Sequence, residues 1–435
     1  MNAAALPAGL APYQSALEAA RDGTADTAAV RQAAFERFAE AGFPSPRDEA
    51  WKYTSLRRLE SRRFAPMPAA APAAGAGSRP ATPEGPRVVV VNGRMLEAPG
   101  PGPAQLRGIR VRTLAQALAD GEPQSALLRV PTGGGTERFA ALNAALCADT
   151  IVVDIAEGAR PDAALHVDLR ATGDSSMSHP RLLVRAGRGA SAQIVVHHAG
   201  DDAAERFVNS YLEVEAGPDS SLRLYRQQAH GSRSFLIERI EATVGQRALL
   251  TVHDAELGGL LSRLDLHVRL AAPGAAAELN GLFLADGQRH LDAHVRVDHL
   301  APDTRSLVDY RGVAASRGRA VFNGKAVVHP GAQKSQARQV SRNLLLTPGA
   351  EIDTKPELEI YADDVQCSHG ATTGQLDPAA LFYLRSRGLD ETEARSALTR
   401  AFAAAVLSRM DLPAFALAVH AILDDRLARI LESPA

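Results

Sequence analysis

The stretch Leu264-Asp265-Leu266-His267-Val268-Arg269-Leu270 alternates strictly between apolar and polar residues. Side chains two residues apart on a strand share a face, so its apolar members turn together toward a core. We expect the polar side chains of Arg263, Asp265, His267 and Arg269 to point outward. Aromatic residues make up only 5% of the chain, which suits a narrow core filled by Val, Leu, Ile and Ala.

Glycine turns recur on both sides of this strand at a nearly constant spacing. They stand at Gly158, Gly189, Gly217, Gly245, Gly274 and Gly331. Successive turns are 31, 28, 28, 29 and 57 residues apart, and the last spacing is twice the others, so we expect the missing turn at Asp303. Strand units of this size cannot bury their apolar faces alone and must stack on their neighbours. The sequence therefore predicts a mainly β fold with a β-helix or β-solenoid core.

Local composition divides the chain into four expected regions. Apolar residues at helical spacing, with stop and start signals at Gly42, Asp390 and Pro413, predict helices near both ends. A segment rich in Pro, Ala and Gly has too little apolar surface to pack and predicts a flexible linker. The regions are an N-terminal helical region (1–64), the linker (65–86), a β-helix core with a helical lead-in (87–360) and a C-terminal helical domain that includes a Cys-x-His segment (361–435).

We expect two residues outside the repeat to have packing roles. Trp51 is the only tryptophan and stands two residues from Tyr53, so we expect it to clamp one segment onto another by burying a large area, rather than to stack on a ligand. Cys147 follows a predicted helix over 138–146, and we expect it to be a buried thiol without a chemical role.

Charge and cysteine usage restrict the compartment and the partners. The 48 basic and 50 acidic residues give a formal charge of −2, which disfavours nucleic acid and an anionic membrane as partners. Two cysteines cannot form a disulfide framework, and the N-terminal residues lack the pattern of a signal peptide. We therefore expect a soluble, cytoplasmic protein.

The segment Tyr361–Gly374 holds the chain's only Cys-x-His motif, Cys367 and His369. A thiolate and an imidazole two residues apart suit a soft or borderline metal such as iron, but a closed site needs further ligands. The alternative is that Cys367 is a small buried apolar residue and His369 a hydrogen-bonded turn residue. Metal or cluster chemistry at this pair is one hypothesis, and packing is the other.

Eight further histidines are scattered over the repeat, and we expect most of them to be solvated. They are His197, His198, His253, His267, His290, His294, His299 and His329. β-Helices also carry carbohydrate-active enzymes with acidic residues along a groove, so Asp292, His294 and Asp298 form an alternative catalytic set. We expect these three to belong to a solvated strand face instead.

Two stretches carry a resemblance to a known family. They are Pro46-Arg47-Asp48-Glu49-Ala50-Trp51-Lys52-Tyr53-Thr54 near the N-terminus and 353–388 near the other end, which includes Cys367-Ser368-His369-Gly370. Both are similar to the SufB/SufD family of the Suf iron–sulfur cluster assembly system. The Trp51 element and the single cysteine in the C-terminal half resemble the SufD branch more than the SufB branch, which is the alternative.

The resemblance implies a right-handed parallel β-helix and a place in a complex with SufB and the ATPase SufC. It implies that the chain pairs side by side with SufB, docks SufC on its C-terminal helices, and turns the Cys367 and His369 segment toward SufB, where a nascent, transient iron–sulfur cluster forms. A homodimer in isolation and a reduced flavin in the complex are further possibilities that it suggests. The docking residues we expect lie off the apolar stripe of the first C-terminal helix: Arg395, Thr399 and Arg400.

The chain lacks the Gly-x-x-x-x-Gly-Lys-Ser/Thr loop that cradles phosphates, so it is not itself the ATPase. With one cysteine near the site it also cannot supply four thiolates to a cluster. We expect a scaffold subunit rather than an enzyme, with the remaining ligands coming from SufB or small thiols.

Overall fold

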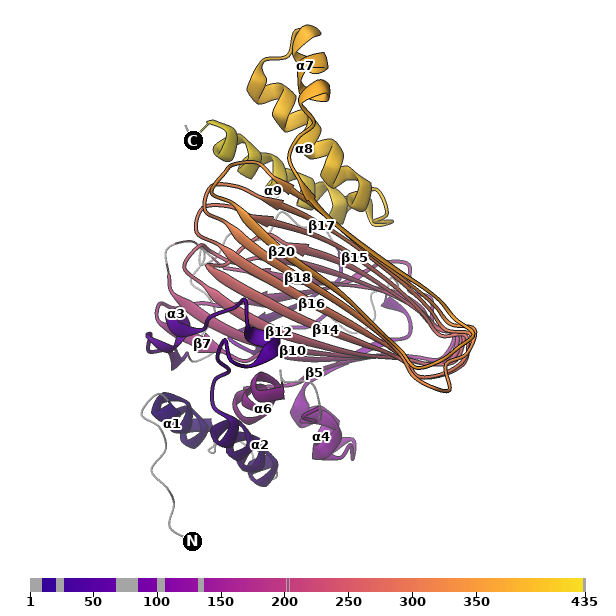
Figure 1. Cartoon of the computed structure of the whole chain (residues 1–435). Helices are drawn as coiled ribbons and strands as arrows, with labels where there is room; N and C mark the ends of the chain where they lie inside the picture. Colours follow the sequence, from indigo (N-terminus) through magenta and orange to yellow (C-terminus); the bar gives the residue numbers. More distant parts are fainter. Residues whose placement is uncertain are drawn as a thin grey trace.

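The computed structural model describes residues 10–20, 27–67, 85–99, 106–131, 137–200, 202 and 204–432. Two long sheets face each other and form a solenoid, with helices packed at its N-terminal and C-terminal ends (Figure 1). This confirms the mainly β solenoid with flanking helical regions.

Consecutive strands alternate between the two sheets, so that each coil contributes one strand to each sheet. The 11-stranded sheet contains β4 (Ile109–Arg112), β5 (Ile151–Ile155), β8 (Arg181–Ala186), β10 (Arg206–Ala216), β12 (Phe235–Val244), β14 (Leu261–Leu270), β16 (His290–His299), β18 (Arg319–Val328), β20 (Glu351–Ile360) and the side strands β1 (Ala65–Pro66) and β7 (Ser176–Ser178). The 10-stranded sheet contains β3 (Arg94–Glu97), β2 (Arg87–Val91), β6 (Leu165–Arg170), β9 (Ser191–Ala199), β11 (Ser221–Ala229), β13 (Leu249–Glu256), β15 (Ala276–Ala285), β17 (Arg305–Ala314), β19 (Gln336–Leu345) and β21 (Gln366–Gly374).

The register of the parallel strands confirms the period. Ser221 pairs with Leu249, Leu249 with Ala276, and Ala276 with Arg305, at offsets of 28, 27 and 29 residues. Each coil therefore stacks directly on the coil before it.

The turns explain why glycine marks the period and why one mark is missing. Gly274 has φ +73°, and at the next coil Asp303 has φ +60°, so the expected turn lies at Asp303. Aspartate tolerates this left-handed conformation better than most residues, which allows it to replace glycine there. Gly217 serves differently: a Cβ on it would meet Ala186 O at 2.5 Å. Close packing of successive turns excludes a side chain at that position.

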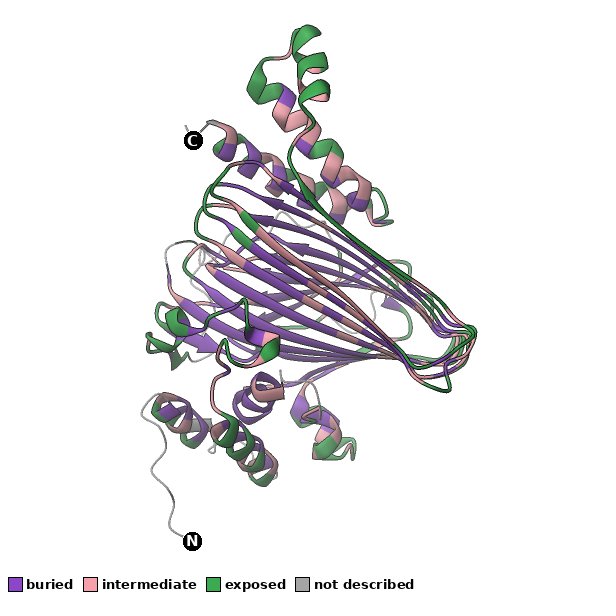
Figure 2. Cartoon of the chain, viewed as in Figure 1, coloured by how far each residue is buried: buried purple, intermediate pink, exposed green. Residues whose placement is uncertain are grey.

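Alternating residues fill the interior as expected, because Leu264, Leu266 and Val268 are all buried in the main core cluster. The expectation of a solvated outer face is wrong for Arg263 and Asp265, which are 0% and 6% exposed. They point away from the core, but Trp51 and Ala50 cover Arg263, which pairs with Asp265 at 2.8 Å. Figure 2 shows how far burial extends over this part of the solenoid.

The part of the chain before β5 packs its helices at this end of the solenoid. Its helices are α1 (Ala11–Ala20), α2 (Ala28–Ala41), η3 (Glu49–Trp51), α3 (Arg57–Glu60), α4 (Leu114–Ala119), α5 (Gln124–Leu127) and α6 (Glu137–Leu146). Trp51 is fully buried, and its ring centroid lies 4.0 Å from the Arg263 guanidinium carbon and 5.6 Å from the Phe139 ring centroid. The packing role predicted for Trp51 is confirmed, and Cys147 is also fully buried.

Three helices follow the last strand: α7 (Pro378–Ser386), α8 (Glu391–Leu407) and α9 (Pro413–Glu432). Asp377 and Asp390 cap the first two by accepting backbone N–H bonds. α8 and α9 bury apolar side chains against the outer face of the 10-stranded sheet, whereas α7 has no buried residue and projects from the body (Figure 1).

The division into four regions stays a proposal. Most of the expected linker, residues 68–84, lies outside the described residues. The Cys-x-His segment forms β21 and pairs with β19, so we propose that the solenoid core extends to Gly374. None of the described helices is long and apolar enough to cross a membrane.

Candidate functional site at the end of the solenoid

Cys367 and His369 lie on β21, the last strand of the 10-stranded sheet. Cys367 pairs with Ala337 and His369 with Gln339, and both of these β19 residues are 3% exposed. In the preceding coil, Gln339 pairs with Val308 of β17, a member of the main core cluster. Because side chains in register share a face, Cys367 and His369 both point toward the inside of the solenoid, at its open end.

Cys367 is half-buried at the corner between the sheets. It packs against a small apolar cluster formed by Val328, Ala332 and Ala362. This burial raises the pKa of the thiol above its ordinary value, and a backbone hydrogen bond from Ala337 opposes the shift. The neutral thiol therefore dominates near pH 7, and a positive partner or a metal would have to draw out the thiolate.

His369 is exposed, and no hydrogen-bond partner is found for its ring among the described residues. The alternative in which His369 is a hydrogen-bonded turn residue is wrong, since it lies within a strand. The imidazole is free to bind a ligand from outside this chain.

The lining beneath this pair is polar. The inward residues of β19 are Gln339, Ser341 and Asn343, all buried, where β17 places Val308 and Tyr310. Gln339 donates from Nε2 to the backbone oxygen of Glu357 at 3.0 Å, while Asn343 Oδ1 has no hydrogen-bond partner in the described structure. Three successive inward positions of β19 are therefore polar, whereas Ala337 and Leu345 at the two ends of the strand stay apolar.

Both final strands leave one backbone edge without a partner strand. β20 and β21 stand at the ends of their sheets, and no described strand covers them. Proteins normally protect long edge strands, because unpaired N–H and C=O groups invite another chain. Four large apolar side chains between residues 360 and 383 are also exposed: Ile360, Tyr361, Phe382 and Tyr383.

The three residues expected to dock a partner do not share one surface. Thr399 is fully buried and donates its hydroxyl to the backbone oxygen of Arg395, so the expectation that it faces outward is wrong. Arg395 is partly buried and donates to Leu346 O at 2.6 Å, which ties α8 to the solenoid. Only Arg400 is exposed, and it pairs with Asp424 of α9 at 2.8 Å. The sequence analysis missed the exposed aromatic pair of α7.

The expectation that most repeat histidines are solvated is also wrong. His197, His198, His253 and His299 are at most 2% exposed, and burial lowers the pKa of His197 to about 3. The set proposed for a carbohydrate-active site is not a solvated groove either, since Asp292 and Asp298 are each 3% exposed and paired with basic side chains.

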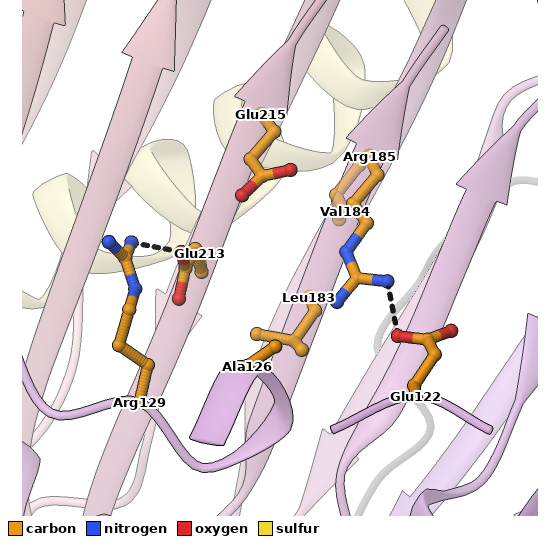
Figure 3. Close-up of a pocket in the computed structure, with 8 residues that line it drawn as sticks. All are labelled: Glu122, Ala126, Arg129, Leu183, Val184, Arg185, Glu213 and Glu215. Atoms are coloured by element: carbon orange, nitrogen blue, oxygen red, sulfur yellow. Dashed lines mark hydrogen bonds and ion pairs between the residues drawn. The ribbon is translucent and has the colours of Figure 1, made fainter. Parts of the chain in front are cut away.

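Two further groups of charged side chains consist mainly of residues that pair with one another. A cavity of about 400 Å³ opens beside α5, and four of its five charged side chains pair: Arg129 with Glu213, and Arg185 with Glu122 at 2.6 Å (Figure 3). Inside the solenoid, the fully buried Arg226 meets the carboxylates of Glu238, Asp254 and Glu256. Within the described residues, no group of three or more His, Cys, Asp or Glu side chains is arranged to hold a metal ion.

The chain is thus a mainly β solenoid that ends in two open strands, with the Cys367 thiol and the His369 imidazole on the last of them. A family model described as the SufBD core domain of the SUF system for FeS cluster assembly matches residues 169–402. The chain therefore belongs to the SufBD family of iron–sulfur cluster assembly proteins.

Individual relatives agree over most of the chain. A SufBD family protein of Synechocystis is 30% identical over 406 residues, covering 90% of this chain and 89% of the relative. The iron–sulfur cluster assembly protein SufD of Escherichia coli is 26% identical over 373 residues, covering 85% and 86%. A SufBD family protein of Mycobacterium leprae is 29% identical over 385 residues, covering 85% and 87%.

Proposed function

We propose that this chain is the SufD-type scaffold subunit of a Suf complex, which pairs with SufB and docks the SufC ATPase. The observation that carries the proposal is the position of Cys367 and His369 at an unpaired sheet edge. The relative named SufD and the single cysteine of the C-terminal half support this branch over the SufB alternative.

The open edges of β20 and β21 are the surface we propose for SufB. Gln366 N–H donates to Ser335 O, so the alternation of a parallel ladder turns the N–H groups of 367, 369, 371 and 373 to the open side. Pro356 lies on β20, and proline is tolerated on an edge strand because its missing backbone N–H has no partner strand to bond. A partner strand that pairs here would lie beside the cysteine and the histidine.

At this interface we propose that His369 binds the nascent cluster or its iron, with Cys367 as an auxiliary ligand. The pair offers one nitrogen and one sulfur, both donors that suit iron, and SufB or small thiols would complete the set. The cluster is cargo that forms and leaves, so an exposed imidazole on an edge strand suits the task better than an enclosed site.

For SufC we propose the aromatic face of α7 together with Arg400. Phe382 is 75% exposed and Tyr383 57%, on a helix with no buried residue of its own. Exposed aromatic side chains of this size are typical of protein interfaces. Nucleotide-driven movement of SufC would reach the solenoid through α8, which Arg395 ties to Leu346.

Cluster content tests the central claim. The chain is co-expressed with SufB and SufC, and iron and acid-labile sulfide are measured per purified complex for His369→Ala, Cys367→Ser and the control Ser368→Ala on the same strand. We expect His369→Ala to reduce both while the complex and its melting temperature stay unchanged, and Cys367→Ser to have a smaller effect. Unchanged iron and sulfide in an intact His369→Ala complex would refute the role.

A proline at the open edge tests the pairing surface. Ala371→Pro removes an N–H that faces the open side, so it should weaken capture of SufB while sparing the pairing with β19. Thr372→Pro removes an N–H that β19 uses, and it should lower the melting temperature instead. Undiminished SufB binding by Ala371→Pro would exclude backbone pairing through β21.

The docking surface is tested by Phe382→Ser and Arg400→Glu. Both should weaken SufC binding without unfolding the chain, because neither side chain is buried. Arg395→Ala is the contrasting variant, and it should loosen α8 from the solenoid and lower the melting temperature. Equal SufC capture by all variants would move the docking site elsewhere.

A further inference from the structure

A concave basic pocket lies beside α3, where the strands β14, β16 and β18 begin. It has a volume of about 500 Å³ and contains neither Cys367 nor His369. The lining of the pocket includes no acidic side chain. It includes five arginines: Arg57, Arg58, Arg289, Arg317 and Arg319. The chain as a whole is close to neutral, so this concentration of positive charge is local.

Three of the five guanidinium groups have no carboxylate partner. Arg289 pairs with Asp286 at 2.8 Å and Arg319 with Glu351 at 2.9 Å. The other three, Arg57, Arg58 and Arg317, make no ion pair with any described residue. Arg289 Nε is buried and lacks a hydrogen-bond acceptor, although it lines the pocket. Uncompensated positive charge and an unmet donor in one concave surface call for an anionic ligand.

The geometry of the arginines narrows the anion. The two neighbours on α3 and Arg317, from the turn before β18, line the same pocket from two different elements. Guanidinium groups bind phosphate oxygens through two parallel hydrogen bonds, which makes arginine the common choice for phosphate recognition. A lone phosphate would leave much of the pocket empty, since this volume is typical of sites for whole organic ligands.

Tyr53 supplies an apolar surface at the same pocket. Its side chain is one of the few large apolar groups left exposed, at 43%, and the Lys52 ammonium lies 5.5 Å from its ring centroid. One ring face therefore carries a positive charge and the other can receive a flat ring. His290 also lines the pocket, but its Nε2 is already bonded to Thr54 Oγ1 at 2.9 Å.

We propose that this pocket binds a nucleotide, with its phosphates on Arg57, Arg58 and Arg317 and its base against Tyr53. The pocket shares no lining residue with β20, β21 or α7, although Arg319 pairs with Glu351 on β20, and the proposal does not depend on the cluster site.

Calorimetric titration of the purified full-length chain with ADP, pyrophosphate and adenosine tests the proposal. We expect ADP to bind saturably and adenosine weakly. Replacing two guanidiniums in Arg58→Gln/Arg317→Gln should weaken ADP and pyrophosphate by roughly tenfold or more, through lost charge-assisted hydrogen bonds. Tyr53→Leu should weaken ADP while leaving pyrophosphate unchanged. The matched control is Arg160→Gln, an exposed arginine outside the pocket.

Three results would overturn the assignment. They are the absence of saturable ADP binding, an equal loss of ADP affinity in Arg160→Gln, and pyrophosphate binding as tightly as ADP while Tyr53→Leu leaves the ADP affinity unchanged. A short single-stranded RNA that binds more tightly than ADP to the same arginines would also replace the nucleotide. The substituted side chains are exposed, so melting temperatures should match the parent chain and keep these outcomes readable.

Discussion

Replacing Asp254 by asparagine should make the stability of the chain less sensitive to pH. Asp254 is 1% exposed inside the solenoid, and one of its carboxylate oxygens accepts from Arg226 Nη1 at 2.6 Å. Burial, with the nearby carboxylates of Glu256 and Glu238, raises its pKa to about 7 despite Arg226. Tyr310 is the other titratable group that faces it.

The sign follows from where the proton is held. In the unfolded chain an aspartate loses its proton near pH 3.9, whereas the folded chain keeps this one until about pH 7. Between these values the folded state binds the extra proton, so a rise in pH destabilises it, and above pH 7 the penalty is constant. A shift of about three units at about 1.4 kcal/mol each amounts to a loss on the order of 4 kcal/mol from this group.

Asparagine keeps an acceptor for Arg226 but cannot ionise. Its amide adds a cost of about 1–3 kcal/mol if a buried donor stays unsatisfied, and that cost does not depend on pH. Urea unfolding of Asp254→Asn and parent chain at several pH values between 4 and 8 should show the variant gaining stability relative to the parent as pH rises. The exposed control Asp162→Asn should show no such trend. A difference that is flat with pH would refute the buried, protonated state.

Three further substitutions test two packing contacts and the turn at Asp303. Trp51→Ala should lower the free energy of unfolding by about 3–5 kcal/mol, because it opens a cavity against Phe139, and a thermal melt should show the loss. Gly281→Ala places a Cβ 2.0 Å from the Tyr310 ring and should cost about 1–3 kcal/mol in urea unfolding, whereas a smaller cost would mean that the ring can move. Asp303→Val puts a β-branched residue at φ +60° and should cost about 1–2 kcal/mol, with Asp303→Gly as the tolerated control.

Features repeated along the chain could be predicted from the sequence. The solenoid followed from two periodicities, two residues along a strand and about 28.5 along the coil, and both are local patterns. The turn at Asp303 followed from the same period.

What failed depended on segments far apart in the chain. Alternation identified the outer face of β14, but it could not show that Trp51, more than 200 positions earlier, covers Arg263 there. β21 was not recognised as a strand because its residues are mostly small or polar. They do not alternate with apolar residues, and this alternation is the pattern that indicates a strand. Thr399 was misplaced because Arg395, its neighbour one turn earlier, reaches back to Leu346 and turns that helix face inward.

The end of the solenoid combines two features that would conflict in an isolated protein. An open sheet edge favours pairing with any exposed strand, while buried polar side chains such as Gln339 and Asn343 penalise a partner that leaves them unsatisfied. An apolar lining would accept many partners, including copies of the chain itself. A polar lining accepts only a partner whose own polar groups complete the hydrogen bonds, so the edge supplies affinity and the lining supplies selectivity. If His369 binds the nascent cluster as proposed, its place on this strand would restrict that binding to a complex with the correct partner.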